Sequence, residues 1–165
     1  LVEASQSGVK IEMIVRGICC LIPGVKGYTE NIKVISIVGR FLEHSRIYRF
    51  GTKEREKVYI GSADFMTRNT IRRVEVAVPI LNQQVRDHLD HMFEMMMSDD
   101  EKGKELTSKG LYVSRNLSEV KMDSQELFYA MAYSQAEKIQ WKSEPFSRKR
   151  RKRLEKSGLQ KSIGK

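Results

Sequence analysis

The residues best suited to chemistry lie in one stretch, FLEHSRIYRFGTKEREKVYIGSAD, from Phe41 to Asp64. His44 and Arg46 precede a short apolar run, and a second apolar run ends at Gly61 and Ser62. An imidazole, a guanidinium, a hydroxyl and a glycine that lets backbone N–H groups approach can converge on one tetrahedral anion. The stretch therefore predicts a phosphate site.

A β-hairpin is the element that positions these side chains. Two runs rich in β-branched and aromatic residues, Ile47 to Phe50 and Val58 to Ile60, flank a polar loop that contains glycine. That pattern is typical of two antiparallel strands joined by a turn. We expect the hairpin to return Ser62 and Asp64 to the side of His44 and of the arginine that follows it.

The order of these residues resembles the H-x-K…G-S-x-N signature of the phospholipase D-like fold. Arg46 stands in place of the Lys and Asp64 in place of the Asn. The Asp expected soon after the Lys is missing, with Gly51 and Thr52 in its neighbourhood. A phosphodiesterase or nuclease of this fold is the second enzyme class to consider, and these departures argue against it.

Two long blocks carry a narrower resemblance: RGICCLIPGVKGYTENIKVISIVGRFLEHSRIYRF and VYIGSADFMTRNTIRRVEVAVPI. Together they resemble the C-terminal catalytic domain of the type 1 polyphosphate kinases, from about Ala4 to Ile80 and more loosely to about residue 140. The resemblance implies an α/β fold: a single phospholipase D-like domain with a mixed sheet flanked by helices. It also implies a parent enzyme that transfers the terminal phosphate of ATP to polyphosphate, reversibly, through a phosphohistidine in a preceding domain.

The resemblance further implies cofactors and partners. Mg²⁺ would accompany ATP, and the family's metal-contacting positions fall outside this chain, so no metal ligand is assigned. ATP, ADP and inorganic polyphosphate are the expected ligands. The preceding domains of the parent chain and further copies of the full-length protein are the expected protein partners.

Two residues receive the main roles by this resemblance. His44 would contact ATP and stabilise or protonate the leaving phosphate oxygen, and Arg16 would clamp phosphate. Independently, Arg16 ends an apolar run and precedes a glycine, which is where open α/β sheets place their ligands. An ion-paired surface arginine and a hydrogen-bonded structural histidine remain the alternatives.

Further residues receive supporting roles. Ser62 would add a hydroxyl, and Arg46 would contact phosphate. Arg72 belongs to an arginine-rich segment that can supply another phosphate contact, although solvated loop charges give the same pattern. Glu75 would orient His44 through the ring N–H.

The resemblance also implies that the isolated domain lacks kinase activity, because the phosphorylated histidine would lie in a preceding domain.

The remaining pattern predicts the order of elements. LVEASQSG reads as the end of a helix closed by Gly8, which together with the missing initiator Met suggests a piece of a longer protein. The spacing of apolar residues over Ile32 to Val38 fits either a strand or a short helix, and the sequence does not decide between them. The other expectations are a strand over Val9 to Val15, a connection over Phe65 to Arg73, a strand over Arg72 to Pro79, a helix over Ile80 to Met97, an irregular connection over Ser98 to Lys121, and a helix from Asp123 with Glu126 to about Lys138.

Positive charge is concentrated at the C-terminus. The chain has a formal net charge of +9, and residues 142–165 hold ten Lys or Arg and two Glu, which leaves about +1 for residues 1–141. We predict a folded domain over 1–141 and a disordered basic tail over 142–165 that binds polyanions. A nucleic-acid-binding module driven by this tail is the alternative, but the run Arg148 to Arg153 lacks interleaved aromatics.

The cellular setting follows from what the sequence contains. No apolar run approaches the length of a membrane span, so a cytoplasmic protein is expected, with peripheral membrane association left open. Cys19 and Cys20 are adjacent in an apolar stretch, which predicts two buried free thiols.

Overall fold

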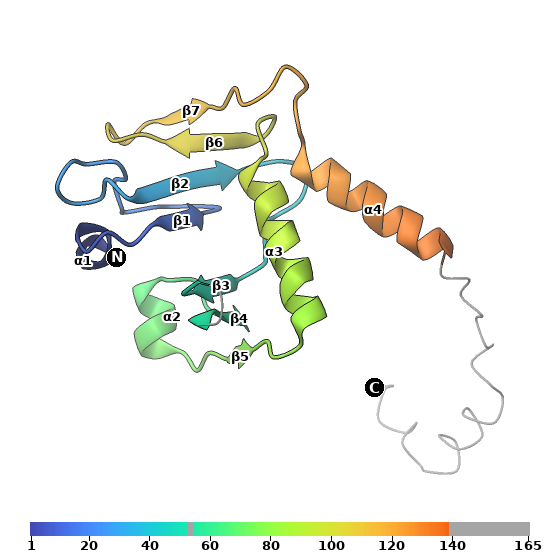
Figure 1. Ribbon diagram of the computed structural model, residues 1–165, viewed down its shortest axis with the longest axis horizontal. Coiled ribbons are helices and arrows are strands. Elements are labelled where there is room, and N and C mark those ends of the chain that lie inside the picture. Colours follow the sequence, from blue (N-terminus) through green and yellow to red (C-terminus); the bar gives the residue numbers. More distant parts are fainter. Residues whose placement is uncertain (53–54, 139–165) are drawn as a thin grey trace, which may run out of the picture. The chain divides into compact units, whose positions relative to one another are not determined.

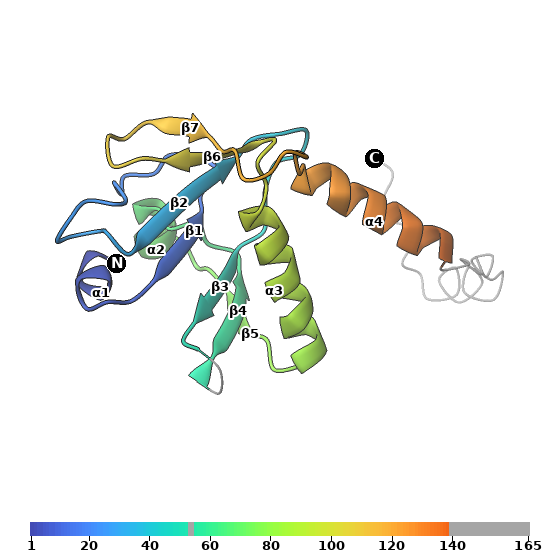
Figure 2. The same ribbon diagram turned by 45° about the horizontal axis from the view of Figure 1, so that its top comes forward.

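The structure is a computed structural model that describes residues 1–52 and 55–138. Its chain divides into two units, Leu1–Leu127 and Phe128–Lys165. All seven strands of the described residues belong to the first unit, in two sheets (Figures 1 and 2). Of the second unit, the described part is helical, with the rings of Tyr129 and Tyr133 6.3 Å apart. The predicted basic tail lies outside the described residues.

The first sheet has the strand order β1-β2-β6-β7. β1 (Ile11–Ile14) pairs in parallel with β2 (Ile32–Ile37), and β6 (Gly103–Leu106) and β7 (Tyr112–Ser114) complete it in antiparallel fashion, so the sheet is mixed as predicted. The segment from Ile32, for which the sequence allowed a strand or a short helix, is the strand β2. β2 is buried along most of its length, and its backbone is paired on both edges, with β1 and with β6, which places it inside the sheet.

The second sheet carries the predicted hairpin. β3 (Ile47–Phe50) pairs with β4 (Lys57–Gly61), which pairs with β5 (Ala77–Pro79), all antiparallel. The turn after β3 uses Gly51 at φ 82°, a conformation that favours glycine. β5 ends at Pro79 as predicted but begins later, because Arg72 belongs to a helix instead.

Two segments predicted as connections contain regular structure. α2 (Thr67–Arg72) lies within the segment Phe65 to Arg73, and β6 and β7 lie within Ser98 to Lys121. The helix has no apolar stripe and is anchored by the buried Asn69, whose Nδ2 donates to the Asp64 carbonyl at 3.2 Å. β6 is short and polar in places, and its pairing between β2 and β7 is a tertiary effect that periodicity does not detect.

The helix predictions agree with the structure within a few residues. α1 (Val2–Gln6) ends before Gly8, which has φ 82° and donates its N–H to the Ser5 carbonyl at 2.9 Å. α3 (Gln83–Met97) starts at a cap formed by Asn82. α4 (Ser124–Lys138) starts after Asp123, whose Oδ1 accepts from the N–H groups of the second and third helical residues at 3.0 and 3.1 Å.

The core lies in the first sheet. Ile32, Val34 and Leu106 form its buried centre, with Cys19 packed against them. The prediction of two buried thiols was wrong for Cys20, which is exposed, because only one of two adjacent side chains turns toward the sheet. Among the described residues no helix has the length and apolar character needed to cross a membrane.

Candidate phosphate-binding site

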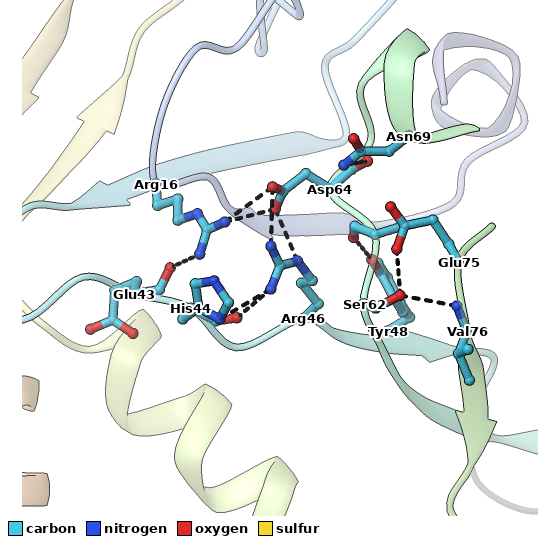
Figure 3. Close-up of polar contacts among 11 residues, drawn as sticks. Arg16, Glu43, His44, Arg46, Tyr48, Ser62, Asp64, Asn69, Glu75 and Val76 are labelled. Atoms are coloured by element: carbon cyan, nitrogen blue, oxygen red, sulfur yellow. Dashed lines mark hydrogen bonds and ion pairs between the residues drawn. The ribbon is translucent and has the colours of Figure 1, made fainter. Parts of the chain in front are cut away.

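Two arginines from different sheets meet at one carboxylate. Arg16 follows β1 and Arg46 precedes β3, and both guanidinium groups point at Asp64, which follows β4 (Figure 3). Arg16 Nη2 lies 3.1 and 3.0 Å from the two carboxylate oxygens. Arg46 Nε and Nη2 each bind a different oxygen at 3.2 Å, the forked geometry that suits carboxylates and phosphates alike. We call these three residues the arginine fork.

The hairpin accounts for this arrangement. Gly61 N–H donates to the Arg46 carbonyl at 2.9 Å, so the residues after β4 return beside those before β3, as the sequence predicted. Tyr48 fixes the next turn of the chain by donating its hydroxyl to the Ala63 carbonyl, and its ring lies 5.2 Å from that of Phe65. Asp64 is thereby placed opposite Arg46.

The charge state of Asp64 follows from its surroundings. Partial burial acts to raise the pKa of the Asp64 carboxyl, but the hydrogen bonds and positive charges of Arg46 and Arg16 outweigh it. The pKa therefore lies below its ordinary value, and the group is ionised at neutral pH. With two guanidinium groups and one carboxylate, the arginine fork keeps a net positive charge.

His44 lies at the exposed edge of the arginine fork. Arg46 Nη1 donates to the His44 carbonyl at 3.0 Å and lies 3.2 Å from His44 Nδ1 (Figure 3). A guanidinium can only donate, so Nδ1 accepts and the ring proton sits on Nε2. This tautomer presents an N–H donor on the side of the ring away from Arg46.

Ser62 and Glu75 lie in a separate polar group. Ser62 Oγ donates to Glu75 Oε2 and accepts from Val76 N at 3.0 Å, which extends the pairing of β4 with β5 (Figure 3). The structure therefore does not bring Glu75 to His44, because the glutamate carboxylate is taken by the serine hydroxyl. The hydroxyl of Ser62 is likewise used within this group.

Arg72 lies at the exposed end of α2. It has no hydrogen bond or ion pair among the described residues, so its guanidinium is open to solvent. The helix that carries it is tied to the arginine fork through Asn69 and the Asp64 carbonyl.

A further set of contacts holds the segment that leads to His44. Arg16 Nη1 donates to the Glu43 carbonyl, and Glu43 Oε1 accepts from Gln125 Nε2 at 2.6 Å. Gln125 is 4% exposed and also binds the backbone of Phe41. Sequence reasoning placed Asp64 near His44 and Arg46 but gave it no role, and it missed Glu43 and Gln125. For Asp64 the available signal was its place at the Asn of the G-S-x-N pattern. For Gln125 the sequence offered no signal, because its contacts with Phe41 and Glu43 join residues more than 80 positions apart.

The carboxylate, imidazole and thiol groups of the described residues do not gather into a metal site. Within residues 1–52 and 55–138, no three His, Cys, Asp or Glu side chains are grouped so that they could hold a metal ion. The one carboxylate of the arginine fork is already bound by two guanidinium groups. The described residues therefore do not fit a magnesium site.

Comparison with known proteins identifies the family. Residues 1–125 match the family described as Polyphosphate kinase C-terminal domain 2. The chain belongs to this family. It is 46% identical over 142 residues to a polyphosphate kinase of Staphylococcus epidermidis, covering 85% of this chain and 19% of that protein. It is 50% identical over 115 residues to a polyphosphate kinase of Prochlorococcus marinus, covering 70% of this chain and 16% of that protein.

A solved structure supports the same assignment. The crystal structure of polyphosphate kinase from Porphyromonas gingivalis matches with a TM-score of 0.76 and 36% identity, over 84% of this chain and 22% of that chain. The predicted phospholipase D-like α/β fold and the resemblance to polyphosphate kinases are thus confirmed. The polyphosphate kinase family is favoured over the phosphodiesterase alternative. This chain spans about a fifth of the length of these relatives.

Proposed function

We propose that this domain works within a longer polyphosphate kinase that transfers the terminal phosphate of ATP to polyphosphate, reversibly, through a phosphohistidine in a preceding domain. Family membership supports the class of enzyme, and the arginine fork is the observation that supports a phosphate-binding role for this part of it. The isolated chain is expected to be inactive, because the phosphorylated histidine lies elsewhere.

Arg16 and Arg46 are proposed to bind the phosphates of ATP and of the product chain. Their side chains are 24% and 15% exposed, so they are partly shielded from water yet still reachable. Charge interactions are stronger in such a setting than on an open surface. Two guanidinium groups on one anion spread the charge that develops on phosphoryl oxygens during transfer.

His44 is proposed to contact the nucleotide and to stabilise or protonate the leaving phosphate oxygen. Its exposed ring carries the proton on Nε2, in line with a donor role toward that oxygen. The contact from Arg46 fixes the ring orientation. Ser62 is proposed to contact phosphate through its hydroxyl, which Glu75 holds, because the Ser62 backbone N–H already donates to the Val76 carbonyl at 3.0 Å. Glu75 supports the site by holding Ser62.

Arg72 is proposed as an outer contact for the polyphosphate chain. Its exposed guanidinium can pair with a phosphate without breaking an internal contact.

Mg²⁺ is proposed to enter with ATP, bound by the nucleotide phosphates, since the described residues supply no site for it. Further copies of the full-length protein remain proposed partners.

The test is polyphosphate synthesis from ATP by the full-length enzyme. We expect His44→Gln to lower kcat by about a hundredfold or more, the usual scale for losing a positioned proton donor. The matched control is His88→Gln, at an exposed position on α3. Equal rates for His44→Gln and His88→Gln would remove His44 from the transfer step, and a wild-type enzyme without ATP-dependent synthesis would reject the proposed function.

A further inference from the structure

Asp64 is the resident anion of the arginine fork. Each of its carboxylate oxygens receives one contact from Arg16 and one from Arg46, at 3.0 to 3.2 Å (Figure 3). The carboxylate thus occupies the position between the two guanidinium groups that a phosphate group would take. Any phosphate must either share the arginines with Asp64 or displace it.

The arginines are not saturated by this contact. A guanidinium has five N–H donors, and Arg16 uses Nη2 on Asp64 and Nη1 on the Glu43 carbonyl. Its Nε–H has no partner among the described residues. Arg46 directs Nη1 to His44 and keeps a second N–H on Nη2. Donors therefore remain for a phosphate that approaches beside the carboxylate.

The carboxylate of Asp64 also weakens the binding of anions to the two arginines. It cancels about half of the positive charge of the two arginines and repels an incoming anion at short range. A lone orthophosphate in the arginine fork gains nothing from contacts elsewhere on the enzyme. A nucleotide triphosphate or a polyphosphate chain binds elsewhere on the enzyme as well, so its phosphate group is presented at high effective concentration and overcomes the repulsion.

We propose that Asp64 is a specificity-determining residue that keeps orthophosphate out of the arginine fork while holding both arginines ready for chain-linked phosphates. This inference rests on the proposed function, because it assigns selectivity to the same site. Asp64 holds Arg16 and Arg46 in place without contacting the reacting atoms. Its loss should therefore change which anions bind more than it changes the chemical step.

The experiment compares Asp64→Asn with wild type in the full-length enzyme. Calorimetric titration with inorganic phosphate and with tripolyphosphate measures binding without turnover. Removing one negative charge from this part-exposed site should tighten orthophosphate binding by roughly five- to tenfold. Tripolyphosphate affinity should change by less than about twofold, because its other contacts remain. Glu56→Gln is the matched control, since it removes a carboxylate that pairs with Arg49 at the other end of the hairpin.

A stable Asp64→Asn enzyme with unchanged or weaker orthophosphate binding would overturn the inference, since Asp64 would then only hold the arginines. Asp64→Ser is the second variant, which removes the charge without leaving an amide. Wild type gives an independent test: orthophosphate should bind on the order of a hundredfold more weakly than tripolyphosphate, and equal affinities would overturn the inference. If anion binding follows these expectations but ATP yields no polyphosphate, the proposed function fails and the inferred selectivity stands.

Discussion

The side-chain amide of Gln125 binds the backbone of Phe41 at both of its polar groups. Gln125 Oε1 accepts from the Phe41 N–H at 2.9 Å, and Nε2 donates to the Phe41 carbonyl at 2.8 Å. The first turn of α4 thereby holds the segment that leads to His44. Asp99 supports this turn in the same way, because its Oδ2 accepts from Ser124 N at 2.8 Å and Oγ at 2.6 Å.

Gln125→Leu should therefore affect both stability and activity. The leucine removes the two hydrogen bonds to the Phe41 backbone and the one to the Glu43 carboxylate, so unfolding free energy should fall by about 2–3 kcal/mol. In the full-length enzyme, KM for ATP should rise because the segment carrying His44 is no longer held. Urea denaturation and steady-state kinetics measure these effects. Gln83→Ala, at an exposed position on α3, is the control. Equal behaviour of the two variants would show that Gln125 does not position the segment.

Arg16→Lys should lower kcat/KM for ATP by about a hundredfold, although it preserves the charge. Lysine has one nitrogen and cannot bind Asp64 and the Glu43 carbonyl with the separate nitrogens that Arg16 uses. Steady-state kinetics of the full-length enzyme measure the effect. Arg55→Lys, at an exposed position at the far end of the hairpin, is the control and should stay within about twofold. A wild-type value for Arg16→Lys would mean that charge alone is needed there.

Arg72→Ala should raise KM for polyphosphate in the reverse reaction while leaving kcat within about twofold, because an exposed arginine binds the chain without entering the transfer step. Kinetics of ATP formation from ADP and polyphosphate measure this separation. A fall in kcat with unchanged KM would place Arg72 at the reacting phosphate instead.

Gly103→Ala should destabilise the chain strongly. A Cβ at Gly103 would lie 2.3 Å from the Asp99 carbonyl oxygen, a backbone atom that cannot swing away. The backbone must shift at the start of β6, so we expect a loss of about 3 kcal/mol or more. Thermal or urea denaturation of the chain measures the loss. Gly17→Ala is the matched control, because its Cβ would meet nothing within 4 Å. Similar losses for both variants would contradict the close approach.

Acid should weaken the fold through Asp100. Its pKa is lowered to about 2, chiefly by the N–H of Met122 and also by those of Leu117 and Ser118. Because the folded pKa lies below the ordinary value of 3.8, the ionised carboxylate stabilises the fold above about pH 4, and this contribution is lost as pH falls toward 2. The difference in unfolding free energy between wild type and Asp100→Asn should therefore shrink over that window. Urea denaturation at a series of pH values measures it, and a difference that is the same at both ends of the window would contradict the account.

Local sequence features predicted much of the fold and part of the site. The hairpin and the return of Asp64 to Arg46 follow from apolar runs and turn residues that are close in sequence. β6 and α2 could not be found this way, because they are short and depend on pairing with β2 and on the buried side chain of Asn69. The partner of Glu75 was missed for a related reason: the short β4–β5 pairing places Ser62 beside it.

The most direct test of the proposed phosphotransfer uses the full-length enzyme with magnesium and ATP labelled on its terminal phosphate. We expect wild type to form an acid-labile, base-stable phosphoprotein and to elongate polyphosphate, and we expect His44→Ala to lose most of both label and product. Cleavage of a phosphodiester without labelling of the protein would contradict this expectation, and the domain would then act as a phospholipase D-like hydrolase.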